Sequence, residues 1–212
     1  MKLVKAIAGL ALVLSANVSA NLIVNGSFED NNVASGSWAK YQANAVNGWD
    51  GRNFEIWDNR GGTAAYEGNQ ILELNSWGAP NVDNNAYMIN QSFDSDVNAS
   101  YAVEFAYKAR SKNDESFLFE ISDDMGNTLF SQVLDDHTKS DWRTFDTRFL
   151  ATSTLSSISF TSISGGTVGN FIDSVSVTAV SATATSVPEP ATLAPFVAAL
   201  LLVGARRMKK AA

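Results

Sequence analysis

Two tryptophans in polar loops are the side chains of this sequence best suited to contact a ligand. Trp57 precedes Asp58 and Arg60, and Trp77 lies in the stretch 75–81, which contains Asn, Gly and Pro. A sugar ring has an apolar C–H face that stacks on an indole, while amides and carboxylates bind its hydroxyl groups. The pattern therefore predicts a carbohydrate-binding site. Its predicted members are Trp57, Trp77, Asp58, Arg60, Asn75 and Asn81.

The alternative for both tryptophans is that they cover hydrophobic edges, as large aromatic side chains usually do. The polarity of their loops favours ligand contact, because a stretch of Gly, Pro and Asn buries an indole less easily. Trp49 and Trp142 stand near the starts of expected strands, and we interpret these two as packing residues.

No pair of side chains stands out as catalytic. A glycosidase needs two carboxylates across a cleft, but the 22 acidic residues of the chain single out no pair. A Ser-His-Asp hydrolase would need a Gly-x-Ser-x-Gly elbow, which the sequence lacks. We interpret His137, which follows two aspartates, as an exposed loop histidine. The sequence therefore predicts a non-catalytic protein.

Composition excludes several other kinds of site. The 212 residues contain no cysteine and one histidine, which rules out disulfides, thiolate nucleophiles, zinc fingers and iron–sulfur clusters. The formal net charge is -7. Because a nucleic-acid-binding protein needs Lys and Arg to replace phosphate counterions, we expect no nucleic-acid partner.

The first 20 residues have the order of a secretory signal peptide. Lys2 and Lys5 form a basic start, residues 6–14 are an apolar run of nine, and small residues occupy 18–20. This order predicts export and cleavage by signal peptidase after Ala20. The alternative is a buried N-terminal helix.

The far end combines three features in order. A small, polar linker at 181–187 leads to the tripeptide Pro188-Glu189-Pro190, and the uncharged apolar run 191–205 is followed by four basic residues. Fifteen helical residues reach about 22 Å, less than the ~30 Å hydrocarbon layer of a membrane. The basic residues would stay in the cytoplasm and stall export.

These three features together resemble the PEP-CTERM sorting signal of Gram-negative bacteria, here at 188–212. The resemblance implies a short transmembrane sorting helix and a transient stage in the inner membrane. It also implies recognition by an exosortase and delivery to the cell surface or extracellular matrix. The alternative is a simple membrane anchor.

The region 21–180 reads as one domain of short strands. Alternating runs are separated by polar turn clusters, and the runs 116–121 and 128–133 flank a turn sequence as in a hairpin. A long central strand is expected at 101–107, and no stretch of 12 residues has helical periodicity. The pattern predicts an all-β fold, a two-sheet antiparallel jelly-roll β-sandwich whose first and last strands pair.

The order of motifs in this region is similar to that of the galactose-binding-like jelly roll. That fold is used by many carbohydrate-binding modules and by related secreted wall-associated proteins. The motifs that carry the resemblance are 21–29 (NLIVNGSFE), Gly48-Trp49, 54–57 (FEIW), 67–74 (EGNQILEL), 89–93 (INQSF), 101–107 (YAVEFAY) and 169–177 (GNFIDSVSV).

The resemblance implies a structural Ca²⁺ ion where the first strand meets the last. Glu29 and Asp173 match the positions that supply carboxylate ligands, and Ser27 supplies a carbonyl oxygen, as does a position near Glu67 or Gln70. Calcium takes six to eight oxygen ligands of these types. The closing motif usually has a second acidic residue, and this chain has serine there. The alternative is that both carboxylates cap strand ends in solvent.

Without both ends, residues 21–187 keep 9 basic and 21 acidic side chains, a net charge of -12. Such a surface repels polyanions and offers oxygens to a hard cation. We expect a secreted, exosortase-sorted surface or matrix protein that binds extracellular polysaccharide without catalysis. The alternatives are a structural biofilm protein that recognises no particular sugar, and a glycan hydrolase of the same fold.

Overall fold

The computed structural model describes residues 19–42, 45–51, 53–76, 87–111, 114–163 and 166–180. The chain divides after Val180 into two units, and all described residues belong to the first. The predicted linker and the sorting motif Pro188-Glu189-Pro190 therefore lie outside the described residues, as do Trp77 and Asn81. Within the described residues, no helix has the length and apolar character needed to cross a membrane.

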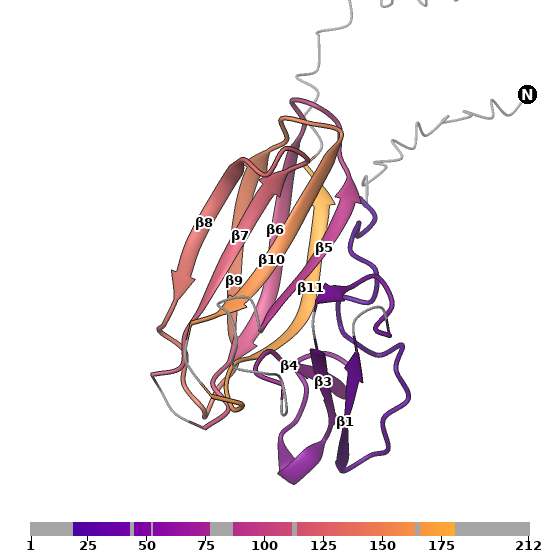
Figure 1. Cartoon of the computed structure of the whole chain (residues 1–212), viewed down its shortest axis with the longest axis vertical. Coiled ribbons are helices and arrows are strands. Elements are labelled where there is room, and N and C mark those ends of the chain that lie inside the picture. The colour runs from indigo at the N-terminus through magenta and orange to yellow at the C-terminus, as the bar shows by residue number, and fades with distance from the viewer. Residues whose placement is uncertain are drawn as a thin grey trace, which may run out of the picture. The chain divides into compact units, whose positions relative to one another are not determined.

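Two antiparallel sheets form a β-sandwich (Figure 1). In order across the first sheet, its six strands are β1 (Ser37–Gln42), β3 (Asn53–Asp58), β4 (Gln70–Glu73), β11 (Phe171–Ala179), β6 (Ser100–Lys108) and β9 (Arg143–Leu150). The five strands of the second sheet are β2 (Asp50–Gly51), β5 (Met88–Asp94), β10 (Leu155–Ser162), β7 (Phe117–Asp123) and β8 (Thr128–Leu134). Among described residues the one helical element is the 3-10 turn η1 (Arg60–Gly62). The predicted all-β, two-sheet antiparallel fold is confirmed.

The core lies between the sheets and is rich in phenylalanine. Along β7, buried residues alternate with half-buried ones, as expected for a strand with one face on the core. Phe105 of β6 has its ring centroid 4.9 Å from that of Phe119 in β7 and 5.0 Å from that of Phe160 in β10. These contacts across the sheets hold the two layers together.

The predicted hairpin is confirmed as β7 and β8, which pair antiparallel. Asp123 closes its turn, because one carboxylate oxygen accepts the backbone N–H groups of Met125 at 3.0 Å and Asn127 at 2.8 Å. The predicted central strand is confirmed as β6, which lies between β11 and β9.

The start of the body is joined to the last strand, as predicted. Leu22 donates its backbone N–H to the carbonyl of Val177 at 2.8 Å, and Val175 donates to the carbonyl of Gly26 at 2.9 Å. The joined segment is a series of turns rather than a regular strand, since Asn25 and Phe28 have φ values of 52° and 58°.

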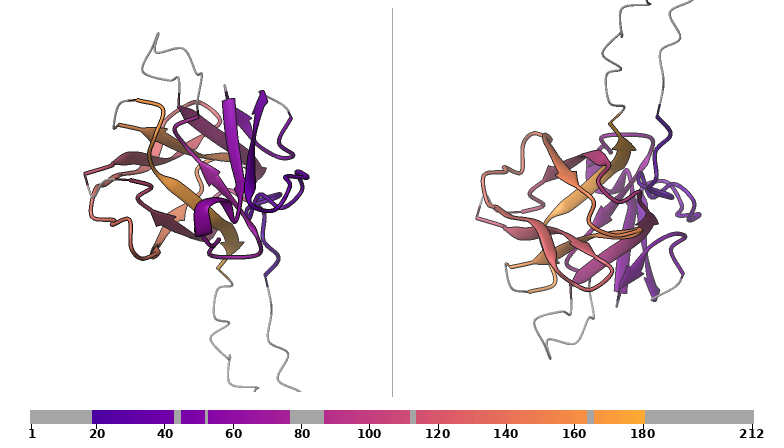
Figure 2. Two further views of the ribbon diagram at one scale, coloured as in Figure 1. Left: turned by 90° about the horizontal axis from the view of Figure 1, so that it is seen from below. Right: turned by 90° about the horizontal axis from the view of Figure 1, so that it is seen from above.

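Strands β1, β3 and β4 gather on one side of the sandwich, beyond β11. Figure 2 shows them from both ends, in indigo and purple, away from the pink and orange strands. This corner of the first sheet carries the side chains that form the candidate site.

Candidate functional site

Strand register brings two tryptophans and two glutamates together on one sheet face. Trp38 of β1 lies directly opposite Trp57 of β3, and Glu55 of β3 lies opposite Glu73 of β4. Opposite residues of an antiparallel pair point to the same face, and so do residues two apart in one strand. The four side chains therefore share a face, although 35 positions separate the first from the last.

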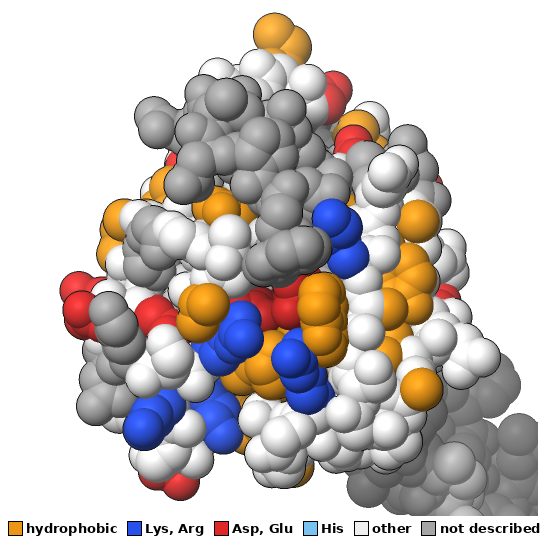
Figure 3. Space-filling model, turned by 60° about the horizontal axis from the view of Figure 1, so that its bottom comes forward, with side chains coloured by type: hydrophobic (Ala, Val, Ile, Leu, Met, Phe, Trp, Pro, Cys, Tyr) orange, Lys and Arg blue, Asp and Glu red, His pale blue; other side chains and the backbone are white. Residues whose placement is uncertain are grey.

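A cavity of about 270 Å³ opens at this face. We call it the Trp–Arg pocket, and its lining residues are Trp38, Glu55, Arg60, Arg110, Thr167 and Val168. Figure 3 looks onto this end of the molecule, where Lys and Arg side chains lie beside hydrophobic ones with acidic side chains recessed between them.

Two arginines stack on the tryptophans. The guanidinium carbon of Arg60 lies 5.1 Å from the ring centroid of Trp38 and 4.9 Å from that of Trp57. The guanidinium carbon of Arg110 lies 4.6 Å from the centroid of Trp57. Such cation–π contacts are stabilising, and they hold the guanidinium groups in place. Trp57 is 6% exposed, whereas Trp38 is half-buried, so Trp38 supplies the aromatic surface that a ligand can reach.

Two buried glutamates hold the pocket residues: Glu55 lines the pocket, and Glu73 lies opposite it in the neighbouring strand. Glu55 accepts the indole N–H of Trp57 at 2.8 Å, and Glu73 accepts hydrogen bonds from the Arg110 guanidinium and from the Gly169 N–H at 3.1 Å. Burial raises the pKa of Glu73 to about 8; Arg110 opposes this shift and the nearby Glu55 adds to it. Glu73 is therefore mainly protonated at neutral pH.

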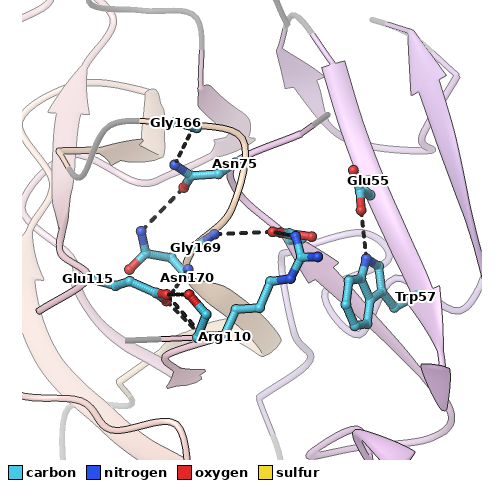
Figure 4. Close-up of polar contacts among 10 residues, drawn as sticks. Glu55, Trp57, Asn75, Arg110, Glu115, Gly166, Gly169 and Asn170 are labelled. Atoms are coloured by element: carbon cyan, nitrogen blue, oxygen red, sulfur yellow. Dashed lines mark hydrogen bonds and ion pairs between the residues drawn. The ribbon is translucent and has the colours of Figure 1, made fainter. Parts of the chain in front are cut away.

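A third carboxylate, Glu115, fixes the loop that carries Arg110. It accepts the backbone N–H groups of Arg110 at 2.6 Å, Ser111 at 2.8 Å and Asn170 at 3.0 Å. Figure 4 shows this network beside the pocket, with Arg110 extended between Glu115 and the β3 strand that carries Glu55 and Trp57. The network ties the segment after β6 to the segment before β11, and these two segments line the pocket.

His137 is buried, and the expectation of an exposed loop histidine is wrong. Its exposed fraction is 1%, and the rings of Tyr107 and Phe117 cover it. Its Nε2 lies 2.8 Å from the side-chain oxygen of Asn170. Burial lowers the pKa of His137, so the neutral imidazole forms the hydrogen bond with Asn170.

The remaining predicted ligand contacts fall into two groups. Arg60 lines the pocket, and Asp58 is half-buried next to it in the chain. Asn75 is completely buried and donates its side-chain amide to the carbonyl of Gly166 at 3.2 Å. Asn75 thus holds a loop beside the pocket from beneath and does not face solvent.

Sequence reasoning did not select Trp38 or Arg110. Trp38 becomes part of the site through its pairing with β3, and Arg110 through a turn that follows the long strand β6. The sequence indicated their role only weakly, because Trp38 is one aromatic residue in a polar segment and Arg110 is an arginine just after the end of a strand.

The two carboxylates predicted to bind calcium converge on one loop. Glu29 accepts the backbone N–H groups of Asn69 at 2.7 Å and Gln70 at 2.6 Å, while Asp173 accepts those of Tyr66 and Glu67. Glu29 is half-buried and Asp173 is fully buried, and burial raises the pKa of Asp173 to about 7. The carboxylates tie the first segment and the last strand to the 66–70 loop.

The oxygen donors at this place fit calcium in kind. They are the carboxylates of Glu29, near the start of the domain, and Asp173, in its last strand. Carbonyl oxygens such as that of Ser27 would have to complete the coordination shell of the ion. No group of three or more His, Cys, Asp and Glu side chains that could hold a metal occurs in the described part of the chain. Carbonyl oxygens would therefore supply most ligands of any ion bound here.

Comparison with known proteins gives a family and a set of similar folds. The family model described as "Protein of unknown function (DUF642)" matches residues 21–178. Among curated proteins, none matches the chain.

Several solved structures resemble this one. A CBM4 structure is 19% identical, with 74% of this chain and 99% of that chain covered and a TM-score of 0.49. TmCBM61 in complex with β-1,4-galactotriose is 17% identical, covering 76% and 100%, with a TM-score of 0.48. The CBM22-1 xylan-binding domain of Paenibacillus barcinonensis Xyn10C is 14% identical, covering 80% and 100%, with a TM-score of 0.45.

Proposed function

The chain belongs to the DUF642 family, and we propose that its β-sandwich is a non-catalytic carbohydrate-binding domain. The observation that carries the proposal is the Trp–Arg pocket, in which the half-buried Trp38 and two arginines border a cavity of about 270 Å³. A cavity with one aromatic wall and a few convergent polar groups is the usual form of a small-ligand site.

The pocket residues match the two sides of a sugar. The indole of Trp38 offers a flat surface for the C–H face of the ring. The guanidinium groups of Arg60 and Arg110 and the hydroxyl of Thr167 offer hydrogen bonds to ring hydroxyls. The buried Trp57 supports the site, because the guanidinium groups of Arg60 and Arg110 both stack on its ring.

The buried acid pair favours binding over hydrolysis. Glu55 and Glu73 lie opposite each other in the register of β3 and β4, and both side chains are at most 2% exposed. A glycosidase needs the scissile bond to lie between its two carboxyl groups. Carboxyl groups buried to this extent are closed to a sugar chain, and we assign the pair to holding Trp57 and Arg110.

Export completes the proposal. The sequences of 1–20 and 188–212 support secretion from a Gram-negative cell, followed by exosortase-dependent sorting to the surface or matrix. The domain would there bind extracellular polysaccharide. A structural matrix protein without specific sugar recognition is the competing function.

Replacing Trp38 with alanine is expected to weaken glycan binding at least ten-fold, about 1.4 kcal/mol, because the accessible stacking surface is lost. The measurement is retention on a polysaccharide panel followed by calorimetry on the best ligand. Tyr66→Ala is the matched control, since Tyr66 is an aromatic residue 50% exposed outside the pocket. Equal loss in both variants would contradict the assignment of the pocket. Absence of saturable binding by the wild-type protein would favour the structural alternative.

The proposal also includes a structural calcium ion held by Glu29, Asp173 and the carbonyl oxygen of Ser27. An ion present at 100 times its Kd stabilises the folded state by about 2.7 kcal/mol, which corresponds to roughly 5–10 °C in Tm. We expect excess EDTA to lower the Tm by this amount and added calcium to restore it. Glu29→Gln keeps an acceptor for the loop N–H groups and should abolish the response to calcium. Identical Tm values in EDTA and calcium would remove the ion from the proposal.

A further inference from the structure

Among the described residues, one arginine of the Trp–Arg pocket has no carboxylate partner. Arg60 touches the rings of Trp38 and Trp57, and within the described residues no acidic side chain forms an ion pair with it. A guanidinium group has five N–H donors in a planar fork that matches a carboxylate. Because Arg60 lines the cavity, these donors can serve a ligand bound there.

The charges around the cavity favour an anion over a neutral ligand. Arg60 and Arg110 line it, and Lys40 lies opposite Glu55 in the β1–β3 register. Against these three cations stand Glu55 and Glu73, and burial raises the pKa of Glu73 to about 8. Among the described residues that line the cavity, the two arginines outnumber the one carboxylate, Glu55, within a body whose net charge is -12.

We propose that the Trp–Arg pocket binds a carboxylate-bearing sugar, such as a uronic acid residue, with the carboxylate on Arg60 and the ring on Trp38. The inference rests on the proposed carbohydrate function and names its ligand class. Arg110 has a separate task, because its guanidinium already pairs with Glu73 and stacks on Trp57. Val168, which is 39% exposed, supplies an apolar edge on the other wall of the pocket.

The acidic surface of the domain does not oppose this binding at short range. At physiological ionic strength the screening length is about 8 Å, so distant carboxylates act weakly on a ligand within the pocket. A guanidinium at hydrogen-bond distance outweighs them, since charge-assisted bidentate pairs are about twice as strong as neutral hydrogen bonds. The negative surface instead keeps long polyanions from binding elsewhere on the domain.

The test uses the purified domain with both termini as they occur after export, and short oligomers of uronate polysaccharides. The probes are oligomers of polygalacturonate, alginate and a glucuronate-containing glycan, each paired with its carboxyl-reduced form. We expect the wild-type protein to bind at least one uronate oligomer ten-fold or more tightly than the reduced form of the same oligomer. Calorimetry at constant ionic strength gives both affinities.

Arg60→Gln separates charge recognition from shape. The substitution keeps a planar hydrogen-bonding group but removes the charge, and Arg60 has no ion pair whose loss would disturb the described fold. We expect the loss of affinity for the uronate oligomer to exceed the loss for its reduced form by a factor of ten or more. Arg148→Gln, at an exposed position of β9, is the matched control and should change neither affinity.

The outcomes distinguish this inference from the function on which it rests. If neutral and uronate oligomers bind equally well and both depend on Trp38, the carboxylate assignment is overturned and the carbohydrate function stands. If Arg60→Gln weakens both forms equally, Arg60 shapes the pocket and does not read charge, which also overturns the assignment. If no oligomer binds, the carbohydrate function itself fails.

Discussion

Replacing Arg110 with alanine is expected to lower the free energy of unfolding at pH 9 by about 3–5 kcal/mol, the usual cost of removing one partner of a buried ion pair. At this pH Glu73 is ionised, because its pKa is about 8, and its charge is left without compensation. Glu73 is fully buried and has Arg110 as its cationic partner, while the same guanidinium stacks on Trp57 at 4.6 Å. The variant thus loses an ion pair and a packing contact. Urea unfolding at pH 9 measures the difference.

The free energy of unfolding should depend on pH in a way that identifies Glu73. Glu73 has a folded pKa of about 8 against an ordinary value of 4.5. Its contribution to stability is therefore fully present below pH 4.5, declines as the pH rises, and stops declining near pH 8, where the folded protein also releases the proton. Without Arg110 the ionised form loses its partner, so the folded pKa rises further. The Arg110→Ala protein should continue to lose stability above pH 8.

Two variants check the origin of that loss. Glu73→Gln in the Arg110→Ala background removes the titrating group, so the continued decline above pH 8 should disappear. Arg148→Ala on the exposed edge strand should change stability by less than about 0.5 kcal/mol. If Arg110→Ala behaves like Arg148→Ala, or if its effect is the same at pH 6 and pH 9, the buried pair does not stabilise the fold as described.

The strands could be predicted because their local pattern and their tertiary environment agree. In β7, apolar residues alternate with polar or smaller ones, and a turn sequence with Asp123 and Gly126 follows at once. Period two is the period of side chains in a strand with one buried face. The alternation therefore carries enough information to identify the strand and its hairpin without knowledge of the partner sheet.

The site could be predicted only in part, because its geometry depends on register. Trp57 and Arg60 are close in the sequence and were found together. Trp38 and Glu73 join them only through the pairing of β1 with β3 and of β3 with β4. A shift of one residue would turn each side chain to the opposite face. No local property of the sequence specifies this register, so the places of Trp38 and Glu73 in the site were not predicted.

Burial is the second property that local sequence did not reveal. Asn75 and His137 stand in polar stretches, which is why both were expected near solvent. Both are buried because the side chain of Asn170 forms hydrogen bonds with both of them, with Nε2 of His137 and with the side-chain oxygen of Asn75. A polar residue is buried when its hydrogen-bond partners are buried with it. Those partners come from segments far apart in the chain.

Replacing Gly26 with alanine is expected to destabilise the fold by about 3 kcal/mol or more, roughly 6–12 °C in Tm. A Cβ at this position would lie 2.0 Å from the carbonyl oxygen of Val175, a backbone atom that cannot rotate away. Val175 also donates its N–H to the carbonyl of Gly26 at 2.9 Å. The methyl group would therefore push the first segment away from β11 and break this hydrogen bond. Thermal unfolding of both proteins gives the shift.

The control is Gly36→Ala, because a Cβ there would meet no atom within 4 Å. Gly36 has a φ of 78°, so alanine costs only the strain of a left-handed residue, about 1 kcal/mol. The two substitutions add the same atom, and the difference between them isolates the contact with Val175. The same displacement would move Glu29 away from the 66–70 loop. Gly26→Ala should therefore lower calcium affinity as well as stability. Equal losses of stability in Gly26→Ala and Gly36→Ala would show that the first segment of the domain can separate from the last strand without cost.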